Sequence, residues 1–215
     1  MSKSALRDDL KNSTVSKHKL IKEFRRKSVH LFALVIPILY MIVPRRESLL
    51  ILAVCAFISI LFDLLKYYDK GFRRLFVKVA GNMLRRKEFK RFTSSSYILC
   101  AALVSILAFD RWVAVIVLIY IIIGDYAAAI FGRRFGKHKT IGSKTLEGSL
   151  AFFFAAHAGA IAFKLIAGID APWAALFMGS LTAAVIEALP LGIDDNLTVP
   201  VLTGALLQLM YIGHF

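Results

Sequence analysis

The segment "GDYAAAIFGRRFGKHKTIGSKTLEGSLAFF", Gly124 to Phe153, interrupts an apolar sequence with glycines, cations and two carboxylates. Apolar runs lie on both sides of it, so it marks the end of one expected membrane span and the start of the next. The chain is 58% hydrophobic, yet it carries 28 Lys and Arg against 14 Asp and Glu, a net charge of +14. This combination is typical of an integral membrane protein.

The same charge would also suit a soluble nucleic-acid-binding protein. Long apolar runs separate the basic blocks, however, so we expect no nucleic-acid partner. Cys55 and Cys100 both lie in apolar runs and indicate neither a disulfide framework nor a metal cluster. We expect no cleavable signal peptide, because the apolar run after the polar start of the chain has no small-residue cleavage site behind it.

Apolar runs close to the spanning length of about 20 residues predict the fold. We expect an all-α, polytopic membrane helix bundle with about seven transmembrane helices and an interfacial amphipathic helix on the cytoplasmic side. The expected spans are 28–44, 47–66, 96–109, 112–130, 148–168, 172–190 and 197–213. A basic cytoplasmic segment, 1–27, would precede a single integral membrane catalytic domain, 28–215. The sequence does not indicate an oligomeric state.

The distribution of Lys and Arg tests this division of the chain independently, because cytoplasmic loops are enriched in cations. Of the 28 cations, 24 fall in residues 1–27, 66–91 and 131–147. These segments alternate with poorly charged loops, as seven spans require. We therefore expect the amino terminus and the polar loops to be cytoplasmic. The membrane would be the cell membrane in a prokaryote and the endoplasmic reticulum in a eukaryote.

Residues 70–91 predict the interfacial helix. Phe72, Leu75, Phe76, Val79 and Met83 recur at helical spacing, and most of the cations of this segment lie elsewhere on the helix. Such a helix places its apolar face in the acyl boundary and its cations on anionic lipid headgroups. Membrane anchoring is the expected role, and a gate for lipid entry is the alternative.

Five carboxylates should gather on the same membrane face as the basic loop. They lie at span ends that open to the cytoplasm: Asp125, Glu147, Glu187, Asp194 and Asp195. An acid inside a span is costly and usually faces a bundle interior or a water-filled cavity, where it has a function. Taken singly, some have structural explanations, since Glu147 could favour a helix amino terminus and Asp194 could cap a helix. As a set, they predict a functional site.

Acids, cations and glycines together suit a polyphosphate bound with a divalent metal. Arg and Lys neutralise phosphate oxygens, glycines let backbone amides approach them, and carboxylates hold Mg²⁺. A Walker A loop is excluded, because the spacing from Gly132 to Lys137 is one residue short and His138 replaces the Ser or Thr.

The motif and a second segment, "VIEALPLGIDDNLTVPVLTG" at 185–204, resemble the signature of the polyprenol kinase family. This family includes dolichol kinase, phytol kinase and the CTP-dependent diacylglycerol kinase of yeast. "RRKSVH", 25–30, and "SSSY", 94–97, also match, so that the resemblance covers nearly the whole chain. It implies transfer of the γ-phosphate of CTP to the hydroxyl of a membrane lipid alcohol, with Mg²⁺ or another divalent ion.

The resemblance implies roles for individual residues. The expected catalytic residues are Asp125, Lys144, Glu147, Glu187 and Asp195. Metal ligands would come from Asp125, Glu187, Asp194 and Asp195. The nucleotide phosphates would contact Gly132, Arg133, Arg134, Gly136, Lys137, Lys139, Gly142, Ser143, Thr145 and Asn196, together with Lys144. Lys27 and His30 are further candidates, for headgroup contact and for orienting a phosphate or acting as a base.

Two other functions remain open at the level of sequence. A cytidylyltransferase acting on a lipid phosphate would also join CTP to a membrane lipid, but it would release pyrophosphate instead of CDP. A non-catalytic transporter or lipid-binding protein would use intramembrane acids without nucleotide turnover, although no inverted repeat supports it. The sequence does not distinguish among diacylglycerol, polyprenol and phytol-like alcohols.

Overall fold

The computed structural model describes residues 27–28, 30–81, 88–89, 91–140, 142, 144–168 and 170–212. Among these residues the structure is helical, with one isolated β-bridge between Lys139 and Thr145 and no strand. Of the predicted basic segment 1–27, only Lys27 falls in the described part of the chain. Met83, Arg85 and Arg86 of the predicted interfacial helix, and Ser143 of the predicted site, lie outside it.

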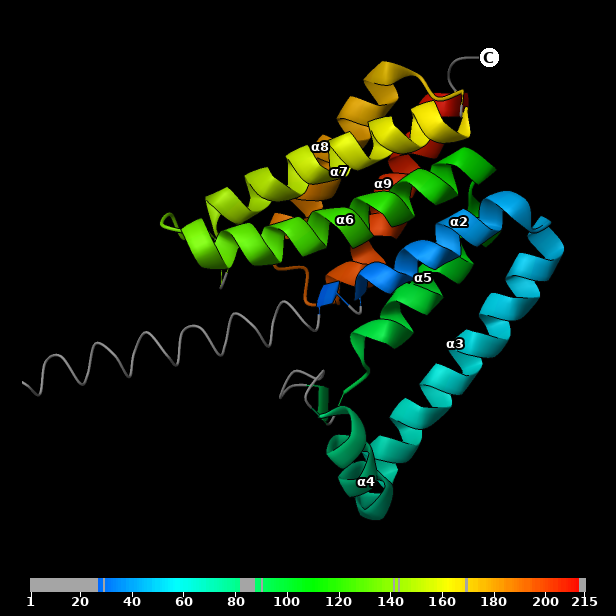
Figure 1. Ribbon diagram of the computed structural model, residues 1–215, viewed down its shortest axis with the longest axis vertical. Coiled ribbons are helices and arrows are strands. Elements are labelled where there is room, and N and C mark those ends of the chain that lie inside the picture. Colours follow the sequence, from blue (N-terminus) through cyan, green and yellow to red (C-terminus); the bar gives the residue numbers. More distant parts are fainter. Residues whose placement is uncertain are drawn as a thin grey trace, which may run out of the picture.

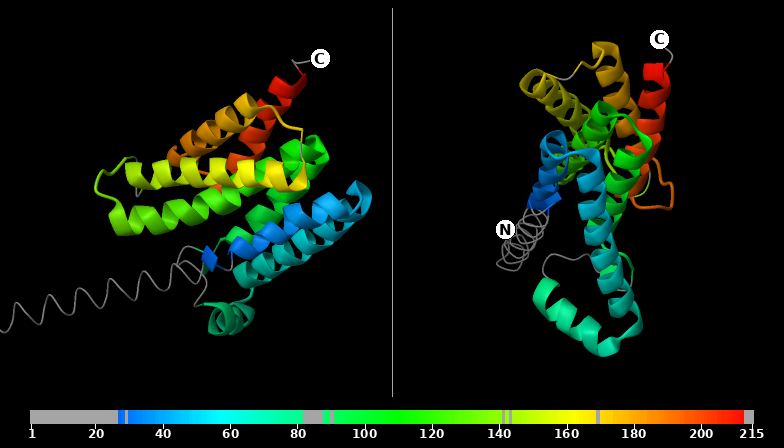
Figure 2. Two further views of the ribbon diagram at one scale, coloured as in Figure 1. Left: turned by 45° about the horizontal axis from the view of Figure 1, so that its top comes forward. Right: turned by 90° about the vertical axis from the view of Figure 1, so that its right-hand side faces the viewer.

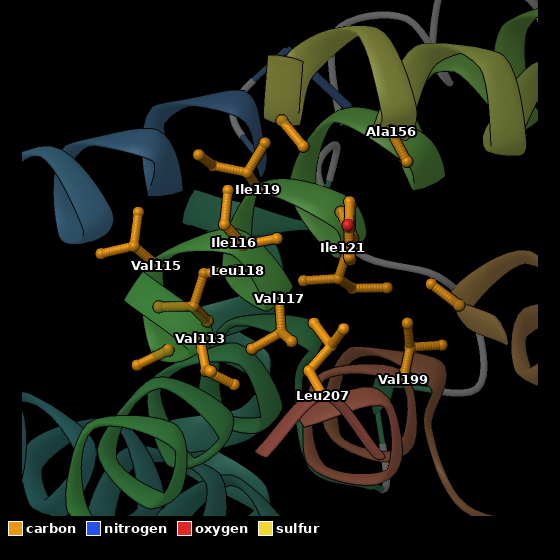
Figure 3. Close-up of a cluster of buried hydrophobic side chains, with 14 of the residues drawn as sticks. Val113, Val115, Ile116, Val117, Leu118, Ile119, Ile121, Ala156, Val199 and Leu207 are labelled. Carbon is orange, nitrogen blue, oxygen red and sulfur yellow. The ribbon is translucent and has the colours of Figure 1, made fainter. Parts of the chain in front are cut away.

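Helix α6 (Arg111–Phe135) is the centre of the fold (Figure 1). Every side chain from Val113 to Ile122 is buried, because other helices surround this stretch. They are η1 (Phe32–Leu34), α2 (Val35–Ile42), α5 (Ser94–Ala108), α7 (Leu146–Ala167), α8 (Trp173–Ala188) and α9 (Asp195–Ile212). Figure 3 shows part of this core, where Ala156 of α7 and Val199 and Leu207 of α9 lie around α6. A helix that is apolar on all sides is expected in such a central position.

Each predicted apolar span contains a helix, but the helices differ in length. Three of those in the described residues are long and apolar enough to cross a membrane, namely α3 (Arg45–Tyr68), α6 and α7. Shorter apolar helices occupy Phe32–Ile42, Ser94–Ala108 and Trp173–Ala188. The helical fold is therefore confirmed, whereas the count of seven crossings stays a prediction.

The polar segments gather at one end of the bundle. In Figure 1 the start of η1, the α6–α7 connection, the α8–α9 connection and the end of α3 lie toward the left and bottom, and the α2–α3, α5–α6 and α7–α8 connections lie at the opposite end. At that opposite end, Arg45 donates hydrogen bonds to the carbonyls of Ile106 (3.1 Å) and Leu107 (2.8 Å). These bonds satisfy carbonyls that the end of α5 leaves without helical partners.

Helix α4 (Lys70–Ala80) is the described part of the predicted interfacial helix, and it turns across the end of α3 (Figure 2). Asp69 caps it by accepting hydrogen bonds from the amides of Gly71 and Phe72. The sequence placed Phe72 and Phe76 in the acyl boundary. In the structure both are half-buried: Phe72 packs on Phe62 of α3, with ring centroids 6.0 Å apart, and Phe76 lies next to Phe72.

A buried polar cluster joins α3 to α5. The carboxylate of Asp63 accepts hydrogen bonds from Lys66 (2.6 Å), from the amide and hydroxyl of Thr93 (2.8 and 3.1 Å) and from Ser96 (2.6 Å). Asp63 and Lys66 are 4% and 0% exposed. Ser59 shares a hydrogen bond of 2.7 Å with Ser96. A charge pair so deeply buried is tolerated because its hydrogen-bonding groups are satisfied.

We expect Asp63→Ala to lower the free energy of unfolding by about 3–5 kcal/mol, because Lys66 would keep its charge inside the protein without a partner. Asp69→Ala is the matched control, since it removes an exposed helix cap and should cost about 1 kcal/mol. Thermal unfolding in detergent measures both. Equal losses in the two variants would contradict a special role for the buried pair.

Candidate active site

Lys144 connects three elements at the polar end of the bundle. Its ammonium group donates a hydrogen bond of 2.7 Å to Asp195, at the start of α9, and another of 2.7 Å to the backbone carbonyl of Glu187, near the end of α8. It also forms an ion pair with the side-chain carboxylate of Glu187. Lys144 itself lies just before α7. Lys144 is 43 residues from Glu187 and 51 from Asp195 in sequence, so the fold brings it to these two carboxylates.

The surroundings of Lys144 stabilise its protonated, charged form. Burial alone would lower the pKa of Lys144, but the attraction of Glu187 and the hydrogen bond to Asp195 outweigh it, so that the pKa lies above the ordinary lysine value. The lysine is therefore a permanent cation at neutral pH. Glu187 is only 4% exposed, and its second oxygen, Oε2, has no hydrogen-bond partner among the described residues.

A second group of charges forms around Asp125 on α6. Lys27 makes an ion pair with Asp125, and Nε2 of His30 lies 3.8 Å from the same carboxylate oxygen. Lys27 is buried, at 5% exposure. Asp125 is also close enough to repel both Glu187 and Asp195 electrostatically. Lys27 and His30, which the sequence named as further candidates, therefore lie in the same site as the carboxylate of Asp125.

Asp194 and Asn196 shape the start of α9. Oδ1 of Asp194 accepts hydrogen bonds from the amide of Asn196 (3.2 Å) and from its side-chain nitrogen (2.7 Å). The Asp194 carbonyl accepts further bonds from the amides of Leu197 and Thr198. This arrangement directs Asp195 toward Lys144 and leaves the buried Oδ1 of Asn196 without a hydrogen-bond partner in the described residues. Asp194 thus has the capping role that the sequence offered as an alternative, and its role as a metal ligand stays a prediction.

The loop between α6 and α7 is folded back on itself. The Thr140 amide donates to the Lys144 carbonyl (3.0 Å), the Leu146 amide donates to the His138 carbonyl (2.9 Å), and Gly142 supplies the left-handed turn at φ +69°. Glu147 accepts hydrogen bonds from the amide of His138 and contacts its ring nitrogen at 2.8 Å. Glu147 therefore braces this loop, and a catalytic role for it stays a prediction.

Close packing of α6 against α7 holds this loop at the site. A Cβ on Gly148 would lie 3.0 Å from Oγ1 of Thr145, 3.3 Å from the carbonyl oxygen of Ala128 and 3.4 Å from Cα of Gly132. Thr145 caps α7 by accepting a hydrogen bond from the Gly148 amide. Gly132 belongs to α6, and the amide of Gly136 donates to the Gly132 carbonyl. Gly132 and Gly136 thus serve helix packing and helix ending, and their contact with phosphates stays a prediction.

The remaining predicted phosphate contacts are exposed. They are Arg133, Arg134, Lys137 and Lys139. Arg134 lies over the ring of Phe135, with its guanidinium carbon 5.4 Å from the ring centroid. These side chains place positive charge at the edge of the site, where a solvated anion would arrive.

Among the residues that the structure describes, no three His, Cys, Asp or Glu side chains form a group able to hold a metal ion. Lys27 and Lys144 instead form ion pairs with three of the four carboxylates expected to bind metal, Asp125, Glu187 and Asp195. Mg²⁺ usually needs only one or two protein carboxylates when substrate phosphates supply the other oxygens. The buried oxygens of Glu187 and Asn196 that have no hydrogen-bond partner suit such an ion.

Asp63 and Lys66, which form the buried cluster beside α5, are not among the residues predicted from the sequence. Their signal was present, because an acid and a lysine three residues apart stand inside the expected span 47–66. Charged residues within a span usually pair with each other or line a functional interior.

Comparisons with known proteins reveal distant relatives. An uncharacterized protein of Rickettsia prowazekii is 24% identical over 183 residues, which are 83% of this chain and 89% of the relative. CTP-dependent diacylglycerol kinase 1 of Schizosaccharomyces pombe is 26% identical over 162 residues, covering 69% of this chain and 74% of the kinase. The kinase of the same name from Saccharomyces cerevisiae is 29% identical over 171 residues, covering 68% and 58%. No protein-family model matches the chain. No solved structure matches it significantly.

We expect Gly148→Val to disrupt the site from a distance. The added side chain would push α7 away from α6 at Thr145 and shift Lys144, at a typical overpacking cost of about 1–3 kcal/mol. Ala158→Val, on an exposed position of the same helix, is the matched control and should change the unfolding temperature little. Thermal unfolding in detergent compares the two variants, and an equal effect would mean that Gly148 packing is unimportant.

Proposed function

We propose that this protein is a CTP-dependent lipid kinase that transfers the γ-phosphate of CTP to the hydroxyl of a membrane lipid alcohol. The observation that carries the proposal is the meeting of Lys144, Glu187 and Asp195 at the polar end of an apolar helix bundle, with Asp125 beside them. The distant similarity to two CTP-dependent diacylglycerol kinases supports it. Diacylglycerol is therefore the first acceptor to test.

The site divides into two groups of residues that suit the two substrates. Lys144, Glu187, Asp195 and Asn196 form the group that we assign to the nucleotide, because the exposed cations of the α6–α7 loop lie on the same segment as Lys144. In the presence of CTP, Lys144 would exchange a carboxylate for a phosphate oxygen. Phosphoryl transfer depends mainly on such alignment and charge neutralisation.

A divalent ion would be held by Glu187, Asp195 and Asn196, which offer the oxygen ligands that Mg²⁺ prefers. Bound there with the nucleotide, the ion would neutralise the charge that develops on the phosphate oxygens. Lys144 would supply positive charge to the same phosphates from the protein side.

The Asp125 group is the one that we assign to the lipid hydroxyl. Asp125 would accept the hydroxyl proton as the oxygen attacks the γ-phosphorus, and CDP would leave with the broken bond's electron pair. Lys27 would hold Asp125 as a carboxylate, and His30 would lie within reach to take the proton onward. The position at a bundle end lets the acyl chains stay in the membrane while the hydroxyl meets a water-soluble nucleotide.

The direct test uses purified protein in detergent with Mg²⁺ and γ-labelled CTP. Diacylglycerol, a polyprenol and phytol are offered separately, and label is followed into the organic phase. We expect labelled lipid together with CDP. Release of pyrophosphate when a lipid phosphate is supplied would assign a cytidylyltransferase instead. Binding of lipid without nucleotide turnover would favour a transporter or lipid-binding protein.

Substitutions at two residues separate the roles within the site. We expect Asp125→Asn to reduce transfer by about 10²–10⁴-fold, as loss of a general base does, while CTP binding is retained. Lys144→Met should weaken CTP binding, and Lys144→Arg should restore part of it by keeping the charge. Equilibrium binding of CTP and the transfer assay measure the two effects. Weaker CTP binding in Asp125→Asn, with unchanged binding in Lys144→Met, would reverse the assignment.

A further inference from the structure

Helix α4 lies where a membrane surface is expected. It begins at Lys70, two residues after the end of α3, which is long and apolar enough to cross a membrane. Figure 2 shows α4 turned across the end of α3 instead of continuing it. An amphipathic helix that turns aside where a span ends is placed to lie along the interface between the acyl chains and the headgroups.

One side of α4 is already occupied by the protein. Phe72 packs on Phe62 of α3, and the ring of Phe76 lies 5.4 Å from the ammonium group of the fully buried Lys66. These contacts fix the rotation of α4 about its own axis. They therefore decide which residues of the helix face away from α3.

The outward side of α4 combines apolar and cationic residues. Leu75 and Val79 are 59% and 80% exposed. Lys70, Arg74 and Lys78 are exposed as well, and their spacing of four residues places them on one face next to Leu75 and Val79. Exposed apolar residues bordered by cations match the acyl boundary and phosphate layer of an anionic membrane.

We propose that α4 is a binding site for anionic phospholipids of the surrounding bilayer. Leu75 and Val79 enter the acyl boundary, and Lys70, Arg74 and Lys78 contact headgroup phosphates. The net charge of +14 and the continuity of α4 with a membrane span favour a lipid surface over a protein partner. The proposal does not depend on the reaction that the active site catalyses.

A probe at Val79 tests the proposal on the full chain. Val79→Cys is prepared in a background of Cys55→Ala and Cys100→Ala, labelled with a nitroxide, and reconstituted in bilayers of phosphatidylcholine alone or with added phosphatidylglycerol. Collision with oxygen and with a water-soluble nickel chelate reports the depth of the label. We expect the label to be deeper when phosphatidylglycerol is present, and salt to weaken the difference.

Charge variants identify the lipid contact. Near an anionic surface each cation contributes about 1 kcal/mol, a preference of roughly fivefold. Arg74→Gln should therefore lower the ratio of membrane-inserted to water-exposed label by roughly fivefold. Arg74→Gln combined with Lys78→Gln should lower this ratio further. Arg46→Gln is the matched control, because Arg46 is an exposed cation near the opposite end of α3.

Four results would overturn the proposal. A label that stays water-exposed in both bilayers would mean that α4 does not enter the interface. The same depth in both bilayers would remove the preference for anionic lipid, and an equal shift with Arg46→Gln would reduce the effect to net charge. Competition by inorganic phosphate at constant ionic strength would assign the cations to free phosphate instead of lipid.

Discussion

The contact on which the polar end of this molecule depends is the one between Lys144 and the two carboxylates of Glu187 and Asp195. Three charges this close would each be costly to desolvate alone. Lys144 partly compensates the two carboxylates, and the three residues tie the start of α7, the end of α8 and the start of α9 into one structure. An apolar bundle can therefore keep ionised groups at its end without opening the core around α6.

The charge balance of the site also explains why it would attract a cation together with a nucleotide. Asp125, Glu187 and Asp195 repel one another, and Lys27 and Lys144 compensate two of these three negative charges. An anionic nucleotide alone would meet residual negative charge there. A cation delivered with the nucleotide would relieve that repulsion, which makes a divalent ion an electrostatically reasonable part of the proposed reaction.

The sequence predicted the features that depend on the free energy of placing individual residues in a membrane span. Apolar length predicted a helix in every expected span, and the penalty for carboxylates in spans identified Asp125 and Glu187 as members of a site. Lys27 and His30 could be named from sequence because they stand beside a span end. Their contact with Asp125 could not be derived, since it depends on how η1 and α2 pack against α6.

The features that the sequence did not reveal depend on tertiary partners. In the sequence, Gly132 and Gly136 resemble phosphate-binding glycines in a basic loop. Only the packed structure shows that Thr145 lies close to both of them and that Gly148 lies close to Gly132. Phe72 and Phe76 belong to the apolar side of an amphipathic helix, and sequence periodicity does not say whether lipid or α3 covers them.

Two separate polar clusters stabilise the helix bundle near its polar end. The buried pair of Asp63 and Lys66 holds the start of α5 against α3, while Phe76 of α4 covers Lys66. The Lys144 group joins the start of α7 to the end of α8 and the start of α9. Because the charged groups of each cluster pair with one another, the helices between the clusters can remain apolar along their length.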